Sequence, residues 1–263
     1  MHITDLPKMN FLKVGRLYLK SAAVEDYITR CCRMVLRESQ DRTLPMWRCG
    51  SATLVRFANA NYVVMTRHQL GVRAGETPDK ETLETVRIAT GADRLTNILL
   101  QNCVFETGNH EEEYHDLLIF EAADDWKTKG VDSAYFYPVG GFCRQPRQIS
   151  RLVGYPSLDG VIDEYHENFC PEAAGEINIK RSIMDCAFDP MFKTNASHYR
   201  RYRHLHPNAV MDGYSGGAVF SIIGELGDLE VVLDGIVVRA GPNDIYVIDT
   251  DYLVTVLSEH KAK

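Results

Sequence analysis

The sequence predicts a mostly β protein made of many short strands, with a helical or strand-forming segment before them and a helix at the end. Three observations predict this. Short runs rich in β-branched and aromatic residues follow one another after Pro45, turn residues separate them, and helical spacing is confined to the two ends. Of the 263 residues 45% are hydrophobic, which is enough to bury a large core.

The N-terminal segment, residues 1–43, is expected to form an extension and the first strand. Within residues 21–37 the apolar side chains recur at helical spacing, at Val24, Tyr27, Ile28, Cys31 and Val35. The end of this stretch also alternates, at Cys32, Met34 and Leu36. The pattern therefore indicates either a helix or a helix that passes into a strand near residue 31.

The middle of the chain contains a series of expected strands with a hairpin turn at Asn59–Asn61. Many short strands at this spacing favour a barrel or sandwich over βαβ units. The expected strands are residues 52–58, 62–66, 85–89, 98–105, 117–120, 149–154, 176–179, 217–223, 230–238 and 245–248.

The end of the chain is expected to be a helix with Thr250 or Asp251 as its cap. Leu253, Val254 and Leu257 would then lie on its inner face.

Charge and cysteine content indicate the class of protein and its surroundings. The formal net charge of −7 argues against a dedicated nucleic-acid binder. No apolar run approaches the roughly 20 residues of a membrane-spanning helix, so we expect no membrane partner. The seven cysteines are odd in number, form no CxxC pair and include adjacent Cys31 and Cys32. Without a stretch like a signal peptide's, we expect reduced thiols in a cytoplasmic protein.

Residues 212–220, Asp-Gly-Tyr-Ser-Gly-Gly-Ala-Val-Phe, are the segment most indicative of chemistry. Ser215 stands between glycines just before an apolar strand, where the backbone turns sharply. Such a turn can direct the backbone N–H groups of Gly213 and Ser215 to one point, where they would hold a negative oxygen. The alternative is a glycine-rich hairpin with an exposed serine.

A serine hydroxyl needs a base, and histidine is the natural one near neutral pH. Of the nine histidines, His68 follows the strand 62–66 and begins a loop, which would hold its side chain at the end of a strand. Asp116 immediately precedes the apolar run 117–120 and would orient the histidine. Taken singly, His68 and Asp116 are also consistent with ordinary polar residues at strand ends.

Together these segments resemble the signature blocks of the chymotrypsin-like serine peptidases, the trypsin family. Val63-Val-Met-Thr-Arg-His68 resembles the family's strand ending in TAAH, Asp116-Leu-Leu-Ile resembles DIAL, and Gly213-Tyr-Ser-Gly-Gly217 resembles GDSGG. The order His, Asp, Ser along the chain also matches. Further resemblances, at residues 50–55, 152–156 and 234–238, extend it over residues 31–260.

The resemblance implies a disulfide-free member with two antiparallel six-stranded β-barrels in one peptidase domain. Residues 44–140 would form the first barrel with His68 and Asp116, residues 141–249 the second with Ser215, and residues 250–263 the C-terminal helix. It implies a serine endopeptidase with a Ser-His-Asp triad, an acyl-enzyme, a protein or peptide substrate, and neither metal nor organic cofactor. The alternative is a catalytically silent or partner-activated module on the same fold that binds protein or nucleic acid.

Two departures from the family concern activation and disulfides. Tyr214 replaces the aspartate that receives the new N-terminal ammonium in trypsin-like zymogens, so that switch cannot operate here. We therefore expect an enzyme that is made active, or is switched by a partner or ligand. Gln69 follows His68 where secreted relatives have cysteine, which agrees with a fold that lacks disulfides.

Other departures concern the substrate. Ala209 lies at the expected base of the specificity pocket and cannot form a charge pair with Lys or Arg, which favours a small or apolar residue before the scissile bond. Val238, Arg239 and Ala240 stand where the family pairs its backbone with an extended peptide. Arg239 would rim that cleft and favour acidic substrate residues.

Two further stretches have alternative interpretations. Tyr199–His206, basic with interleaved aromatics, would be a nucleic-acid site or, as we expect, a solvated loop over the cleft. His110–Asp116 has the residue types of a metal site, but it carries adjacent like charges and lacks a second ligand cluster, so we expect no metal there.

Overall fold

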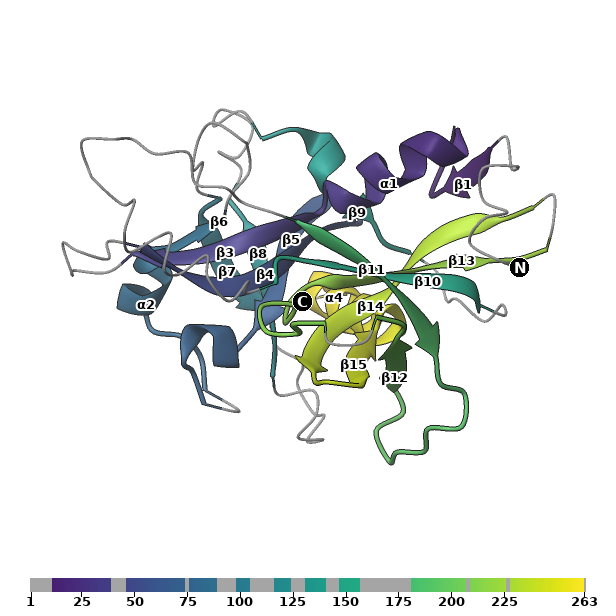
Figure 1. Cartoon of the computed structure of the whole chain (residues 1–263). Helices are drawn as coiled ribbons and strands as arrows, with labels where there is room; N and C mark the ends of the chain where they lie inside the picture. The colour runs from purple at the N-terminus through teal and green to yellow at the C-terminus, as the bar shows by residue number, and fades with distance from the viewer. Residues whose placement is uncertain are drawn as a thin grey trace, which may run out of the picture.

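The structure is a computed structural model in which two β-sheets lie side by side (Figure 1). The first sheet is formed by strands within residues 32–138, and the second by strands within residues 147–249 together with two short strands near the N-terminus. The residues that the structure describes are 11–38, 46–73, 76–88, 98–104, 116–123, 131–140, 147–156, 181–206, 209–225 and 228–262.

The first sheet is a curled half-barrel with the strand order β6-β3-β4-β5-β8-β7, and β9 pairs in parallel with β4. Within the described residues its end strands β6 and β7 do not pair with each other. Its strands are β3 (Cys32–Glu38), β4 (Met46–Phe57), β5 (Ala60–Thr66), β6 (Val86–Ile88), β7 (Leu100–Val104), β8 (Leu117–Ala122) and β9 (Tyr137–Pro138).

The hairpin between β4 and β5 is confirmed, but its turn is formed by residues 58 and 59, and Asn61 of the expected turn already belongs to β5. The turn residues Ala58 and Asn59 have φ values of 45° and 67°. Two successive positive φ values are typical of the tight turns whose twist matches that of the flanking strands.

The second sheet closes on itself. Six of its eight strands run in the order β13-β10-β11-β12-β15-β14, and β14 pairs back with β13, which completes an antiparallel barrel. The strands are β10 (Arg147–Gly154), β11 (Ser182–Phe188), β12 (Tyr199–His204), β13 (Ala218–Ile223), β14 (Glu230–Ala240) and β15 (Asp244–Asp249). The two sheets confirm the mostly β, double-barrel fold expected from the sequence.

The N-terminal extension packs on the second barrel. Strand β1 (Leu12–Val14) pairs with β14 and with β2 (Leu17–Leu19), and helix α1 (Ser21–Thr29) follows. Strand β3 begins at Cys32, which confirms a helix that passes into a strand near residue 31. The short helices are η2 (His68–Leu70), α2 (Lys80–Thr85) and η5 (Ser133–Tyr135).

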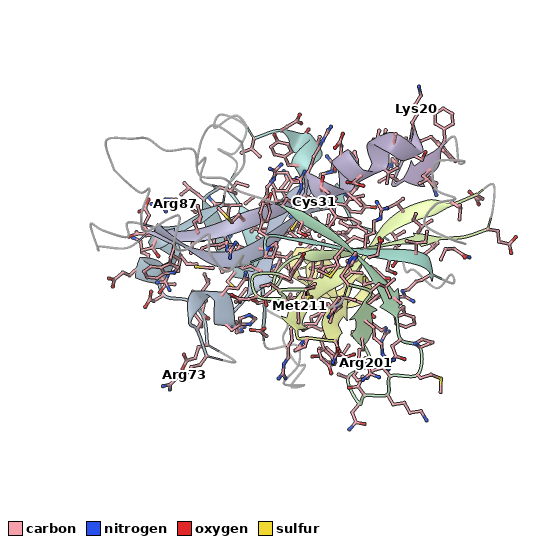
Figure 2. The ribbon with its side chains drawn as sticks, in the orientation of Figure 1. Lys20, Cys31, Arg73, Arg87, Arg201 and Met211 are labelled. Atoms are coloured by element: carbon pink, nitrogen blue, oxygen red, sulfur yellow. The ribbon has the colours of Figure 1, made fainter. Side chains whose placement is uncertain are left out.

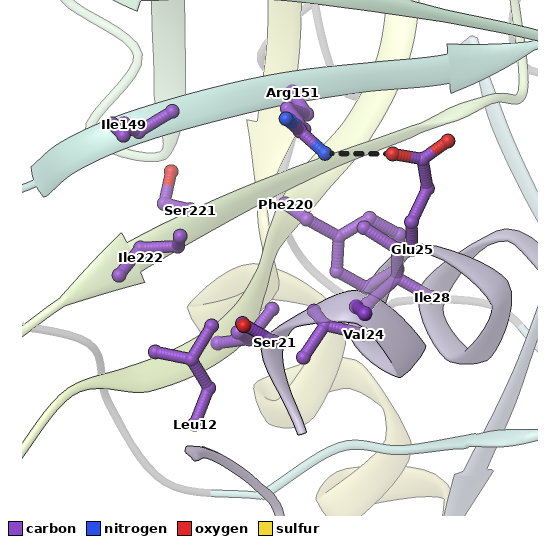
Figure 3. Close-up of a pocket in the computed structure, with 12 residues that line it drawn as sticks. Leu12, Ser21, Val24, Glu25, Ile28, Ile149, Arg151, Phe220, Ser221 and Ile222 are labelled. Carbon is purple, nitrogen blue, oxygen red and sulfur yellow. Dashed lines mark hydrogen bonds and ion pairs between the residues drawn. The ribbon is translucent and has the colours of Figure 1, made fainter. Parts of the chain in front are cut away.

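A pocket of about 310 Å³ lies between α1 and the second barrel (Figure 3). Its walls are largely apolar, and an ion pair of 3.1 Å joins Arg151 of β10 to Glu25 of α1 at this pocket. None of the residues expected in the catalytic site lines it.

Helix α4 (Thr250–Ala262) connects the two sheets. Leu253 and Leu257 are fully buried and Val254 is half-buried, while His260 bonds to Glu121 of β8 at 3.1 Å. The expected cap was wrong. Asp249 accepts the Tyr252 N–H at 3.1 Å, because the buried last residue of β15 already points its carboxylate at the first turn. No helix in the described residues is long and apolar enough to cross a membrane.

The basic run Tyr199–His206 was expected to be a solvated loop over the cleft, and this was wrong. Residues 199–204 form β12, paired with β11 and β15. Tyr202 points inward and is fully buried, whereas its arginine neighbours form ion pairs with acids of adjoining segments. Because those acids are distant in sequence, the run looks like an isolated basic segment until the barrel is formed. The expected strand 176–179 lies outside the described residues.

Asp234 anchors a polar network inside the second barrel. Its side chain is 2% exposed and accepts hydrogen bonds from Arg147, Tyr202 and Ser221 at 2.5–2.7 Å. A buried charge is tolerated only when it is paired and hydrogen-bonded. Burial, followed by the neighbouring Asp234 charge, keeps the pKa of the Tyr202 hydroxyl well above its usual value.

We predict that Asp234→Ala lowers the free energy of unfolding by about 3–5 kcal/mol, because it leaves the Arg147 charge in the barrel without this carboxylate. Urea denaturation followed by circular dichroism measures the change. Asp228→Ala, at an exposed carboxylate, is the matched control and should change stability by less than about 0.5 kcal/mol. Equal stabilities of the two variants would contradict the anchoring role.

Candidate active site

His68 and Asp116 are brought together by the pairing of two strands. His68 follows β5 and Asp116 precedes β8, and these strands pair with Thr66 opposite Leu117. The His68 Nδ1 and Asp116 Oδ2 atoms are 2.7 Å apart, and the backbone N–H of His68 donates to Asp116 Oδ1 at 3.1 Å. The carboxylate thus holds both the ring and the backbone of the histidine.

This contact has a chemical consequence for the imidazole. A ring that donates its Nδ1 proton to a carboxylate presents Nε2 as the atom that can accept a proton. The His68 side chain is 52% exposed and that of Asp116 is 27% exposed, so Nε2 belongs to a side chain that a substrate can reach.

The loop around Ser215 is shaped by glycines. Gly213 and Gly216 have φ values of 88° and 76°, a region that strongly favours glycine. Within the described residues neither the Gly213 N–H nor the Ser215 N–H donates a hydrogen bond to the protein, whereas the N–H groups of Gly216 and Gly217 donate to Val237 and Tyr214. Two unpaired amides at one turn are what the expected oxyanion hole requires.

The carbonyl groups of the same loop are bonded to the first sheet. Ser51 on β4 donates its N–H to Ser215 O at 3.0 Å and its hydroxyl to Gly213 O at 2.8 Å. Thr53, also on β4, donates to Gly216 O at 2.9 Å. The sequence alone does not identify these two positioning residues, because a Ser-x-Thr in a strand gives no indication of a distant loop as its partner.

Gln69 joins the histidine segment to the serine loop. Its side-chain amide donates to Ser215 O at 2.9 Å, and it is the residue directly after His68. This hydrogen bond therefore links the residue next to His68 directly to Ser215. Within the described residues, however, no hydrogen bond joins the Ser215 hydroxyl to the His68 imidazole.

The residues expected to bind substrate lie on the second barrel. Val238 is buried at a register shift between β14 and β15, Arg239 is exposed, and Ala240 is partly buried. After Val237, residues 239 and 240 pair with β15 along one edge only, as far as the described residues go. Ala209 packs against the barrel core near Met211, which Figure 2 shows near the middle of the molecule.

Tyr214 fills the position where the resemblance leads one to expect an acid. Its side chain is fully buried in the core of the second barrel, and Gly154 lies so close to its ring that a Cβ there would overlap it. A tyrosine side chain at this position offers no carboxylate to an incoming ammonium group.

The five cysteines in the described residues are free thiols: Cys31, Cys32, Cys49, Cys103 and Cys186. Burial raises the pKa of Cys32 to about 12 and those of Cys49 and Cys103 to about 11. These three side chains are thus protonated thiols at neutral pH and are weak nucleophiles.

Comparison with known proteins supports the fold. No family model and no curated protein matches the sequence. Among solved structures, kallikrein-related peptidase 10 in a complex with Zn2+ is similar over 90% of this chain and 98% of its own, with a TM-score of 0.50 and 12% identity. A thermostable serine protease, AL20, from an extremophilic microorganism is matched over 90% of this chain and all of its own, with a TM-score of 0.45 and 15% identity. The chain has the chymotrypsin-like double-barrel fold.

We predict that Gly216→Ala lowers the free energy of unfolding by roughly 3 kcal/mol, because a Cβ would overlap Ser51 O and the backbone would be strained. Gly71→Ala is the matched control. Gly71 has a φ of 69° and open space around its Cβ position, so it should cost about 1 kcal/mol from strain alone. Thermal and urea denaturation would measure both, and equal losses would contradict the close approach of the two sheets.

Proposed function

We propose that the protein is a serine endopeptidase in which Ser215 is the nucleophile, His68 the general base and Asp116 the group that orients the histidine. The observation that carries the proposal is the hydrogen bond of 2.7 Å between His68 and Asp116. A second observation supports it: the backbone amides of Gly213 and Ser215 have no partner within the described residues. The double-barrel fold supports the proposal but does not by itself define a reaction.

The proposed reaction is amide hydrolysis through an acyl-enzyme. His68 Nε2 takes the hydroxyl proton as Ser215 Oγ attacks the carbonyl carbon, and the negative oxygen is held by the Gly213 and Ser215 amides. The C–N bond then breaks, and His68 gives its proton to the leaving amine. Water attacks the ester in the same way and restores Ser215. These steps use no metal or organic cofactor.

The Ser215 hydroxyl must form a hydrogen bond with His68 before this reaction can start. In free enzymes the catalytic hydrogen bonds are often long and become short only when substrate binds. A partner that stabilises the aligned arrangement would act as an activator. The alternative function is therefore a partner-activated or catalytically silent module. The lack of a hydrogen bond between Ser215 and His68 is the observation that favours this alternative.

The substrate we propose is an extended peptide. Residues 238–240 have a backbone edge that such a peptide can pair with, and Ala209 favours a small or apolar residue before the scissile bond. Nucleic acid is a poor candidate, because Arg200, Arg201 and Arg203 of β12 already pair with acids. The free thiols described above suit a reducing compartment, and we propose the cytoplasm.

We predict that a fluorophosphonate probe labels the wild-type protein at Ser215. The Ser215 oxygen forms a bond to phosphorus, fluoride leaves, and the hydroxyl proton goes to His68. Ser215→Ala should abolish labelling, and Asp116→Asn should slow it by several orders of magnitude, up to about 10⁴-fold, because the imidazole tautomer is no longer fixed. Mass spectrometry of the labelled peptide locates the modification.

Ser221→Ala is the control for the loss of a serine hydroxyl elsewhere, since Ser221 is buried in the Asp234 network. It should label like the wild type at temperatures where it is folded. A folded wild-type protein that never labels would support the silent module instead. Cleavage-site mapping in a cell extract, with wild type against Ser215→Ala, then tests peptide-bond hydrolysis itself.

We predict that Arg239 favours acidic residues in the substrate, because its exposed guanidinium lies beside the proposed peptide edge. Arg239→Glu should lower kcat/KM for acidic peptides by roughly tenfold and raise it for basic ones, in a peptide library assay. Arg87→Glu, on the first sheet and already paired with Glu38, is a control for net charge. The same preference in wild type and Arg239→Glu would contradict this role.

A further inference from the structure

The side chain of Gln69 is buried and uses its amide fully. Its Nε2 donates to Ser51 O and to Ser215 O, both at 2.9 Å. Its Oε1 accepts from the backbone N–H of Thr66 at 2.8 Å and from the Thr66 hydroxyl at 2.9 Å. One side chain therefore links β5, β4 and the Ser215 loop, and buried polar networks of this kind rigidify their surroundings only when every member is satisfied.

The space for this amide is provided by two glycines. A Cβ at Gly50 would overlap Gln69 Nε2, and a Cβ at Gly216 would lie 2.9 Å from Gln69 Oε1. Both glycines have positive φ values, 136° and 76°. One belongs to the first sheet and the other to the Ser215 loop, so the cavity that holds Gln69 is built from both halves of the molecule.

The bonds to Ser215 O have a direct effect on the candidate nucleophile. This carbonyl accepts two hydrogen bonds, one from Gln69 and one from the Ser51 N–H. Together they hold the peptide plane that follows Ser215, and this constrains where the Ser215 Cα and its side chain can lie. Gln69 is at the same time the neighbour of His68, so a shift of this amide moves the base and the nucleophile relative to each other.

We propose that Gln69 is a positioning residue of the catalytic site, which holds the Ser215 loop at a fixed distance from His68 through a hydrogen-bonded bridge between the two sheets. This inference rests on the proposed function, since it needs Ser215 to act as the nucleophile. It goes beyond the triad because it assigns the alignment of the triad to a neutral side chain outside it. A misplacement of about 1 Å at such a site can cost a hundredfold in rate.

The test compares rates of fluorophosphonate labelling in folded proteins. Gln69→Met keeps the length of the side chain and removes all four hydrogen bonds, and Gln69→Glu turns a carboxylate toward two carbonyl oxygens. Both should label about ten to a hundredfold more slowly than wild type, at a temperature well below each melting transition. The matched control is Gln148→Met, at a glutamine of β10 that donates to Gly224 O at 3.2 Å, and it should label at the wild-type rate.

A second readout separates positioning from stability. The carboxyl group that Gln69→Glu introduces can, when protonated, donate one hydrogen bond and accept others, much as the amide does. The labelling rate of Gln69→Glu relative to wild type should therefore rise as the pH falls from about 8 to about 5, where more of this carboxyl is protonated. A side chain that only stabilised the fold would alter the melting temperature and leave the labelling rate of folded molecules unchanged.

The outcomes distinguish this inference from the proposed function. A labelled wild type with an equally labelled, folded Gln69→Met overturns the positioning role alone. A wild type that never labels overturns the proposed function, and this inference with it. If the Gln69 variants do not fold, Thr66→Val decides, because it removes one bond to Gln69 Oε1 and keeps the shape of the core. It should label about threefold more slowly, and the wild-type rate would overturn the proposal.

Discussion

The hydrogen bonds that cross from the first sheet to the Ser215 loop are the constraint on which the candidate site depends. Ser51, Thr53 and Gln69 bind the carbonyl groups of Gly213, Ser215 and Gly216. With three carbonyls held on one side, the loop cannot rotate its peptide planes freely. Gly213 and Ser215 are half-buried, and their N–H groups have no protein partner among the described residues, so a ligand or water can satisfy them. The same bonds thus secure the interface and leave two donors available.

Strand pairing provides the other half of the site. The β5–β8 pair places His68 beside Asp116, and their contact needs no long loop to bring it about. The serine loop, in contrast, belongs to the second barrel, where Val237 of β14 exchanges hydrogen bonds with Gly216 and Gly217. The candidate site is therefore rigid within each half, and its alignment depends on the contacts between the halves. Helix α4 adds one such contact, through His260 and Glu121.

Charges in the second barrel are largely satisfied inside the molecule. Asp189, Asp234 and Asp249 pair with arginines from β10 and β12, so a segment with three arginines presents little free positive charge. Side-chain hydrogen bonding from Arg201 keeps the pKa of the Asp189 carboxyl below its usual value. These pairs define which face of β12 lies inward and explain why a basic run belongs to a sheet. Because these arginines are paired, we propose peptides rather than nucleic acid as partners.

The sequence by itself left open whether the helix continues past residue 31 or passes into a strand there. It determined the strand-rich class and the hairpin at Asn59, and it indicated the residues of the candidate triad. These depend on local patterns, namely alternation, turn residues and short motifs at strand ends. It did not determine β12, the Asp249 cap or the hydrogen bonds of Gln69, because each depends on partners far away in the chain. Only the tertiary structure decided them, since a polar side chain shows its function only when its hydrogen-bond partner is in place. A glutamine that follows a histidine has no special meaning in a sequence. Gln69 connects the two sheets only because they pack around its side chain in the folded protein.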